Sequence, residues 1–173
     1  MKNITLILLI LCCLNSCKSS KGVVTKKSKN TKVLVVDNSH STEPDDSIVN
    51  AIIDYAKQFD GVKYKYGGTT KKGMDCSGLV TTAFKSENIL LPRTTGDLSM
   101  RGHPIDLNDV QKGDLLFFAT KKNRKGINHV GLVTDVRPGY IEFIHATTSA
   151  GVIISNLAEH YWHFAFVQAR RIL

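Results

Sequence analysis

The chain has 173 residues, of which 42% are hydrophobic and 22% charged, and 23 basic residues against 15 acidic ones give a net charge of +8. This composition is typical of a globular protein and excludes a disordered chain, collagen and a multi-span membrane protein. No internal repeat of about 20 to 50 residues is present, which excludes solenoids and propellers. The length therefore predicts one domain with a short tail.

The N-terminal segment has the features of an export signal. Lys2 precedes an apolar run, residues 4–14, that is too short for a transmembrane helix but long enough for the core of a signal peptide. The run ends in Leu14-Asn15-Ser16-Cys17, which resembles the lipobox of bacterial lipoproteins. We therefore expect residues 1–16 to be a lipoprotein signal peptide and Cys17 to be lipidated. Ordinary secretion with cleavage after Ser16 is the alternative.

Residues 17–46 are expected to form a flexible tether, because Ser, Thr, Lys and Asn dominate and cannot bury enough apolar surface to offset the ordering entropy. The folded domain is then 47–173. Cys76 is its single cysteine, which excludes a disulfide framework there. The domain is mildly basic, yet an exported chain without a stacking motif or basic helix is not expected to bind nucleic acid. A carboxylate-rich wall polymer is the expected polyanion.

The hydrophobic period changes along the domain. Helical spacing predicts a helix over 48–59 that stops at Gly61, a second over 76–84, and a short third after Thr94. Strands are predicted over 114–119, 129–136, 140–146, 152–155 and 164–172. Arg137-Pro138-Gly139 is a turn signal that joins two of them as a hairpin. Helices followed by an antiparallel meander predict an α+β fold.

The candidate catalytic residues lie where these two halves meet. Cys76 falls in the first turn of the predicted second helix, where free backbone N–H groups and the helix dipole favour a thiolate. A thiolate nucleophile needs an imidazole to hold the ion pair and to protonate a leaving amine. His129 opens one strand and His145 lies near the end of the next, so both side chains are expected on one face. The pattern predicts Cys76 as nucleophile, His129 as base and His145 as the residue that orients the base.

Six motifs, in this order, resemble those of the NlpC-type cell-wall cysteine peptidases. They are Tyr64-Lys65-Tyr66-Gly67-Gly68, Asp75-Cys76-Ser77-Gly78-Leu79-Val80, Leu91-Pro92-Arg93-Thr94-Thr95, Gly113-Asp114-Leu115, His129-Val130-Gly131 and His145-Ala146. The closing stretch, 145–171, is most similar to the Spr-type murein endopeptidase lipoproteins of that family. The resemblance implies a papain-like α+β fold with N-terminal helices packed on an antiparallel sheet. It also implies cleavage of peptidoglycan peptides with no metal or organic cofactor.

The resemblance assigns roles to individual residues. It supports the Cys76, His129 and His145 set, and it implies that the Tyr64 hydroxyl helps to hold the oxyanion, together with the backbone N–H of Cys76. Asp75 and Ser77 flank the nucleophile and, in some relatives, contact the amine of the substrate. The segment 119–128, with its basic run 121–125, is longer and more basic than in those relatives. Substrate preference at that border of the site is therefore left open.

Other conspicuous residues have plainer interpretations. We expect Tyr161 and Trp162 to belong to the core rather than to a sugar platform. No sequence motif pairs His103, His160 or His163 with another candidate catalytic residue, and we expect these three histidines at the surface.

Together these features predict a monomeric murein endopeptidase, lipid-anchored in the periplasm at the outer membrane through Cys17. The resemblance to the Spr-type enzymes implies that D-alanyl–diaminopimelate cross-links of peptidoglycan are cleaved, and the lack of an extra wall-binding domain also favours this bond. The γ-D-glutamyl–diaminopimelate bonds cleaved by other relatives are the alternative. A catalytically silent wall-binding module that keeps the cleft is a second possibility. A zinc site made of Cys76, His129 and His145 is a third, because these are competent ligand types.

Overall fold

The computed structural model describes residues 46–120 and 126–173; the expected signal peptide, Cys17, almost all of the tether and the basic run 121–125 lie outside this description. The elements are α1 (Asp46–Lys57), β1 (Thr69–Thr70), β2 (Gly73–Met74), α2 (Cys76–Ser86), α3 (Thr95–Leu98), β3 (His103–Ile105), the short 3-10 helix η1 (Leu107–Asp109), β4 (Leu115–Phe118), β5 (His129–Arg137), β6 (Tyr140–Thr147), β7 (Gly151–Asn156), α4 (His160–Ala165) and β8 (Phe166–Arg171). Among these, no helix is long and apolar enough to cross a membrane.

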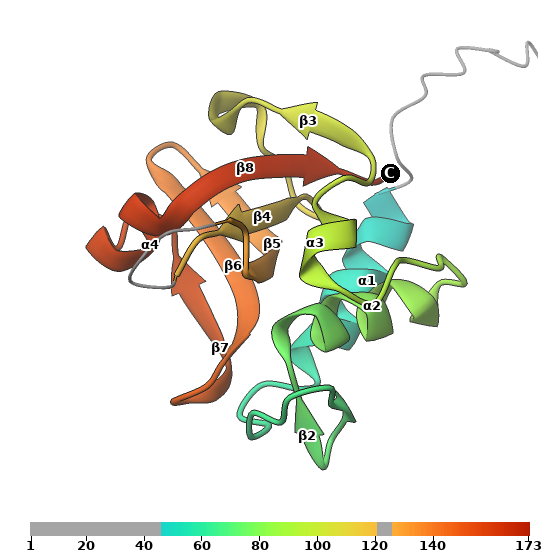
Figure 1. Cartoon of the computed structure of the whole chain (residues 1–173). Coiled ribbons are helices and arrows are strands. Elements are labelled where there is room, and N and C mark those ends of the chain that lie inside the picture. Colours follow the sequence, from blue (N-terminus) through green and yellow to red (C-terminus); the bar gives the residue numbers. More distant parts are fainter. Residues whose placement is uncertain (1–45, 121–125) are drawn as a thin grey trace, which may run out of the picture. The chain divides into compact units, whose positions relative to one another are not determined.

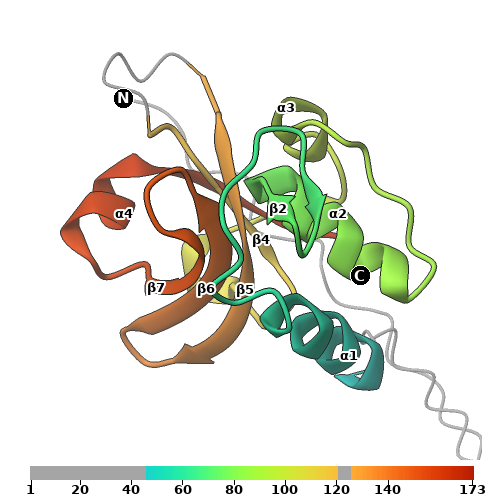
Figure 2. The same cartoon turned by 90° about the horizontal axis from the view of Figure 1, so that it is seen from below.

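An antiparallel sheet of six strands, in the order β3-β8-β4-β5-β6-β7, forms the centre of the domain (Figure 1). The helices α1 and α2 lie on one side of this sheet and α4 on the other, as the turned view shows (Figure 2). β1 and β2 form a separate small hairpin just before α2. Helices packed on an antiparallel sheet give the α+β class predicted from the sequence.

Alternation along the strands produces two hydrophobic cores, one on each face of the sheet. Leu115 and Phe117 pack with α1 and α2, whereas Leu116 and Phe118, their neighbours on β4, pack with Trp162 of α4. All four β4 side chains are fully buried, which explains why this strand is a continuous apolar run in the sequence. Each such side chain stabilises the fold by about 1.5–3 kcal/mol relative to an exposed one.

The start of α2 is fixed by its cap and by a close backbone approach. Asp75 is the N-cap residue, and its Oδ1 accepts a hydrogen bond of 2.6 Å from the backbone N–H of Gly78. A Cβ added at Gly78 would lie 2.1 Å from the backbone oxygen of Gly68, so only glycine fits at this position. The Cys-Ser-Gly motif therefore holds the first turn of α2, and with it Cys76, against the preceding loop.

The β5–β6 hairpin places the two candidate histidines on neighbouring strands. Its turn, Pro138-Gly139, is closed by the pairing of Arg137 with Tyr140, as the turn signal predicted. Gly139 has a φ of 73°, the left-handed conformation that glycine adopts without strain. The hairpin thus confirms the predicted adjacency of the strands that carry His129 and His145.

The predicted elements agree with the structure except near the C-terminus and in the short strands. The strand expected over 164–172 begins later, because residues 160–165 form α4, whose Trp162 and Ala165 are buried against the sheet. The two-residue strands β1 and β2 were not predicted, nor was β3, whose burial pattern gives no apolar alternation. β3 is held by its pairing with the distant β8.

Candidate active site

Cys76 is the first residue of α2 and its thiol is nearly enclosed, with 8% of the residue exposed. Its Sγ lies 3.7 Å from Oγ1 of Thr95, which follows the N-cap of α3. The sulfur also accepts a hydrogen bond from the backbone N–H of Val130, the residue directly after His129. The structure therefore brings the start of α2 against the start of β5.

Both oxygens of the Asp75 carboxylate, next to Cys76, accept hydrogen bonds from neighbouring groups. Its Oδ2 accepts hydrogen bonds from the Gly67 N–H at 2.7 Å and from Arg93 at 2.8 Å, and its Oδ1 accepts from the Gly78 N–H. Arg93 also donates to the Ser77 hydroxyl at 2.8 Å. Burial alone raises the pKa of Asp75, but the hydrogen bonds from Arg93 and the two amides outweigh it, so the net shift is downward and the carboxylate is ionised.

The two predicted histidines contact each other directly. His129 Nε2 and His145 Nδ1 are 2.9 Å apart, with the ring planes nearly perpendicular. The register pairs Leu132 with Ile144, and continuing this antiparallel pairing puts His129 and His145 on the same face, one diagonal step apart. The expectation that the hairpin places both imidazoles on one face is confirmed.

Sequence reasoning assigned no role to Ser155, which continues this row of side chains. Its Oγ lies 3.0 Å from Nε2 of His145. On β7, His145 is paired with Ile153, so Ser155, two residues further on, points to the same face as His145. Because Val152, Ile153 and Ile154 are all apolar, the sequence of this strand carries no alternation that could have placed Ser155 there.

Aromatic rings enclose the histidine pair. The Trp162 ring stacks on His129 with centroids 5.4 Å apart and meets His145 edge-on at 4.5 Å, while Phe143 lies 4.7 Å from His145. Burial lowers the pKa of His129 to about 4. Burial, followed by the proximity of His129, lowers the pKa of His145 to about 3. Both imidazoles are therefore neutral at neutral pH.

The resting state of the thiol differs from the expectation of a thiolate. Burial raises the pKa of Cys76, and this effect outweighs the hydrogen bonds from Thr95 and from the amides of Val130 and Ser77. Within residues 46–120 and 126–173, no hydrogen bond joins the thiol to His129. The thiol of Cys76 and the imidazole of His129 are consequently both neutral at neutral pH.

A cleft of about 310 Å³ opens beside Cys76. Its lining includes the predicted residues Tyr64, Asp75, Cys76 and Ser77, together with Arg93. Tyr64 is half-buried, and burial followed by the charges of Cys76 and Asp75 raises the pKa of its hydroxyl, which therefore stays protonated and able to donate. The cleft brings together the residues for which the sequence predicted oxyanion and substrate contacts.

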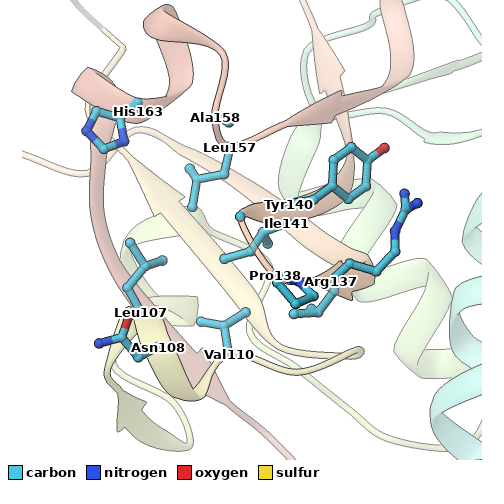
Figure 3. Close-up of a pocket in the computed structure, with 12 residues that line it drawn as sticks. Leu107, Asn108, Val110, Arg137, Pro138, Tyr140, Ile141, Leu157, Ala158 and His163 are labelled. Carbon is cyan, nitrogen blue, oxygen red and sulfur yellow. The ribbon is translucent and has the colours of Figure 1, made fainter.

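A larger cavity of about 540 Å³ lies elsewhere, next to the β5–β6 turn (Figure 3). Leu157, Ile141 and Leu107 give it an apolar wall, and His163 stands at its edge (Figure 3). None of the predicted site residues line it, so the larger cavity is separate from the predicted site.

Of the remaining predictions from the sequence, some agree with the structure and one is wrong. Trp162 belongs to the core as predicted, but the expectation for Tyr161 is wrong, because the first turn of α4 directs it outward and 56% of it is exposed. The three other histidines, His103, His160 and His163, are exposed as expected. In the described part of the chain, no three His, Cys, Asp or Glu side chains are arranged to hold a metal ion, so the zinc alternative has no ligand set there.

The family match and the similar proteins of known name point to the same family. Residues 61–171 match the NlpC/P60 family. A probable endopeptidase NlpC homolog of Haemophilus influenzae is 40% identical over 124 residues, or 71% of this chain and 62% of the relative. The murein DD-endopeptidase MepS/murein LD-carboxypeptidase of Escherichia coli K12 is 37% identical over 127 residues, or 73% of this chain and 64% of the relative. The matched region thus covers less than two thirds of the length of each of these two relatives.

Solved structures agree with this assignment. A NlpC/P60 family protein from Bacillus cereus superimposes with a TM-score of 0.66 at 32% identity, covering 72% of this chain and 40% of the other. RipD of Mycobacterium tuberculosis, described as a non-catalytic NlpC/p60 domain protein, shares the fold with a TM-score of 0.58 at 21% identity, over 73% of this chain and 98% of the other. On the extent of these matches and the papain-like α+β arrangement, the chain belongs to the NlpC/P60 family.

Proposed function

We propose that the protein is a cysteine peptidase that cleaves the stem peptides of murein, with Cys76 as nucleophile, His129 as base and His145 as the residue that orients the base. The observation that carries this proposal is the hydrogen-bonded pair of His129 and His145, together with the free thiol of Cys76, which contacts the backbone N–H of Val130, the residue directly after His129. The names of the relatives, which include a murein DD-endopeptidase, support the substrate class.

In the proposed reaction, His129 Nδ1 takes the thiol proton as Sγ of Cys76 attacks the carbonyl carbon of the scissile bond. The neutral resting state makes this a general-base step rather than attack by a preformed thiolate. The Tyr64 hydroxyl and the Cys76 N–H stabilise the oxyanion. The His129 imidazolium then protonates the leaving amine, and a water molecule activated by His129 hydrolyses the thioester.

The state of Asp75 supports the choice of bond. Both of its oxygens are already hydrogen-bonded, and Arg93 neutralises its charge. A terminal ammonium group of a substrate would have to displace Arg93 to reach this carboxylate. The site therefore suits an internal cross-link, such as D-alanyl–diaminopimelate, better than a γ-D-glutamyl bond next to a free amine. Relatives named for the second type, such as the γ-D-glutamyl-L-lysine dipeptidyl-peptidase of B. cereus, keep that bond as the alternative.

We further propose that residues 1–16 are a lipoprotein signal peptide, that residues 17–46 tether the 47–173 domain, and that lipidated Cys17 anchors the protein in the periplasm at the outer membrane. The lipobox-like residues 14–17 after the apolar run support this placement. We expect a monomer whose partner is peptidoglycan rather than nucleic acid. Metabolic labelling with a fatty-acid analogue should mark the wild type and not Cys17→Ala, whereas label persisting in the variant would contradict an anchor at Cys17.

Digestion of purified murein by the full chain, with products identified by mass, tests the activity and the bond together. We expect loss of cross-linked muropeptides and appearance of monomers ending in D-alanine. Cys76→Ser is the matched control, and a chelator should leave the activity intact while a thiol alkylator abolishes it. Murein that is bound but not cut by the folded wild type would instead support a silent binding module.

A further inference from the structure

A row of hydrogen bonds crosses three strands of the central sheet. It runs from His129 Nε2 on β5 to His145 Nδ1 on β6 at 2.9 Å, and from His145 Nε2 to Ser155 Oγ on β7 at 3.0 Å. The β6–β7 register pairs His145 with Ile153 and Phe143 with Ser155, which makes the second bond a diagonal neighbour contact on one face. The backbone pairing of three strands thus fixes all three side chains in one line.

The direction of the proton in each of these bonds follows from what His129 must do. To accept the thiol proton at Nδ1, a neutral His129 must carry its own proton on Nε2 and donate it to His145. His145 must then accept at Nδ1, so its single proton resides on Nε2. That N–H needs an acceptor, and the hydroxyl oxygen of Ser155 is at hydrogen-bond distance from it.

The surroundings of His145 make this acceptor important. The residue is fully buried, and the rings of Phe143 and Trp162 occupy the space around it. Among the described residues, His129 and Ser155 are its hydrogen-bond partners. Without an acceptor at position 155, the Nε2–H would be buried and unsatisfied, which favours the other tautomer. That tautomer would point an N–H of His145 at the N–H of His129 and break the pair.

We propose, on the basis of the cysteine-peptidase function proposed above, that Ser155 is a positioning residue: it holds His145 in the Nε2-protonated tautomer and thereby keeps Nδ1 of His129 free to take the proton of Cys76. Ser155 does not contact the reacting atoms and takes no proton itself. During attack the S–H bond breaks and an N–H bond forms at His129 Nδ1, while the other two hydrogen bonds keep their direction. The hydroxyl of Ser155 supplies an uncharged end to the row, in a site where both imidazoles are neutral.

Three variants of the full-length protein separate this role from packing. Ser155→Ala removes the acceptor and should lower kcat by about 10- to 100-fold with little change in KM, the effect expected from one unsatisfied buried donor. Ser155→Thr keeps the hydroxyl and should restore most of the activity. Thr134→Ala is the matched control, because Thr134 is also a buried hydroxyl residue of this sheet, bonded to Glu142 at 2.7 Å outside the row. It should keep the wild-type kcat.

The tautomer is measured independently of turnover by nitrogen-15 NMR of the imidazoles. We expect His145 to be protonated at Nε2 in the wild type and in Cys76→Ser, and to lose this preference in Ser155→Ala. A wild-type His145 protonated at Nδ1 would overturn the proposal, as would a folded Ser155→Ala with wild-type kcat, or a Ser155→Thr no more active than Ser155→Ala. A wild type that does not cleave murein would contradict the proposed function instead, while the spectra would still test the row.

Discussion

The helix side and the sheet side of the site differ in charge and in access to solvent. On the helix side, Cys76 opens onto a cleft with an ionised Asp75 and a half-exposed Arg93. On the sheet side, His129 and His145 are buried under Trp162 and carry no charge at neutral pH. In the proposed mechanism, the charged groups of the helix side face the substrate, whereas the imidazole that takes the thiol proton belongs to a buried row that is uncharged at rest.

Removing the residues at the meeting point of the two sides should have the largest effect. We expect Cys76→Ala and His129→Ala each to lower kcat/KM on a defined cross-linked muropeptide by about 10⁴-fold or more. The double variant should be no worse than either single, because the thiol and the imidazole act as one unit. Circular dichroism serves to confirm folding, and losses that multiply in the double variant would show that the two residues act separately.

Changing the orienting residue should cost less. His145→Ala should lower kcat/KM by about 10²- to 10³-fold, since it leaves the base in place but unsupported. His145→Asn and His145→Gln keep a group that can hydrogen-bond His129 and should retain more activity than His145→Ala. A folded His145→Ala with full activity would reduce His145 to a structural strand residue.

The buried sheet side predicts how stability depends on pH. Below about pH 6.5 the unfolded chain protonates both histidines, whereas the folded chain resists protonation until about pH 4 at His129 and about pH 3 at His145. The histidine contribution to stability is thus complete above about pH 6.5 and is lost progressively toward pH 4, at about 1.4 kcal/mol for each pH unit and histidine. Urea unfolding from pH 8 to 4 checks this, and His129→Gln should flatten the slope. An equal slope in that variant would be inconsistent with a neutral buried His129.

The charged helix side predicts the smallest effects. Arg93→Gln releases one partner of Asp75 and should cost less than about 1 kcal/mol of stability, because the Arg93 side chain is 41% exposed. Its kcat/KM on cross-linked muropeptides should fall by about tenfold or less, while its relative activity on peptides with a free terminal ammonium rises. The exposed Arg101 offers a control in Arg101→Gln. If the preference does not change, Arg93 plays no part in substrate selection.

The sequence predicted the parts of the site that depend on local signals. Cys76 at a helix start and the turn before Tyr140 were recognisable because capping residues and turn residues act over a few positions. The Ser155 contact depends on the register between β6 and β7, which no local pattern specifies. The burial of the thiol depends on α2 packing against β5, and this distant contact reverses the expected direction of its pKa shift. The position of Cys76 and the hairpin turn could therefore be predicted from the sequence, whereas the direction of the pKa shift of Cys76 required the tertiary structure.

The pH at which Cys76 ionises is the most direct test of the central claim, that the thiol is neutral at rest and gives its proton to His129 only when it attacks the substrate. The ionisation is measured by the thiolate absorbance near 240 nm as a function of pH. The same titration of Cys76→Ser gives the contribution of the other thiols, which is subtracted from that of the wild type. We predict that the thiolate of Cys76 appears only at alkaline pH, with a pKa above that of an ordinary cysteine, because burial raises it. A thiolate already present at pH 5 to 7, and lost in His129→Ala, would show a preformed ion pair and contradict this account.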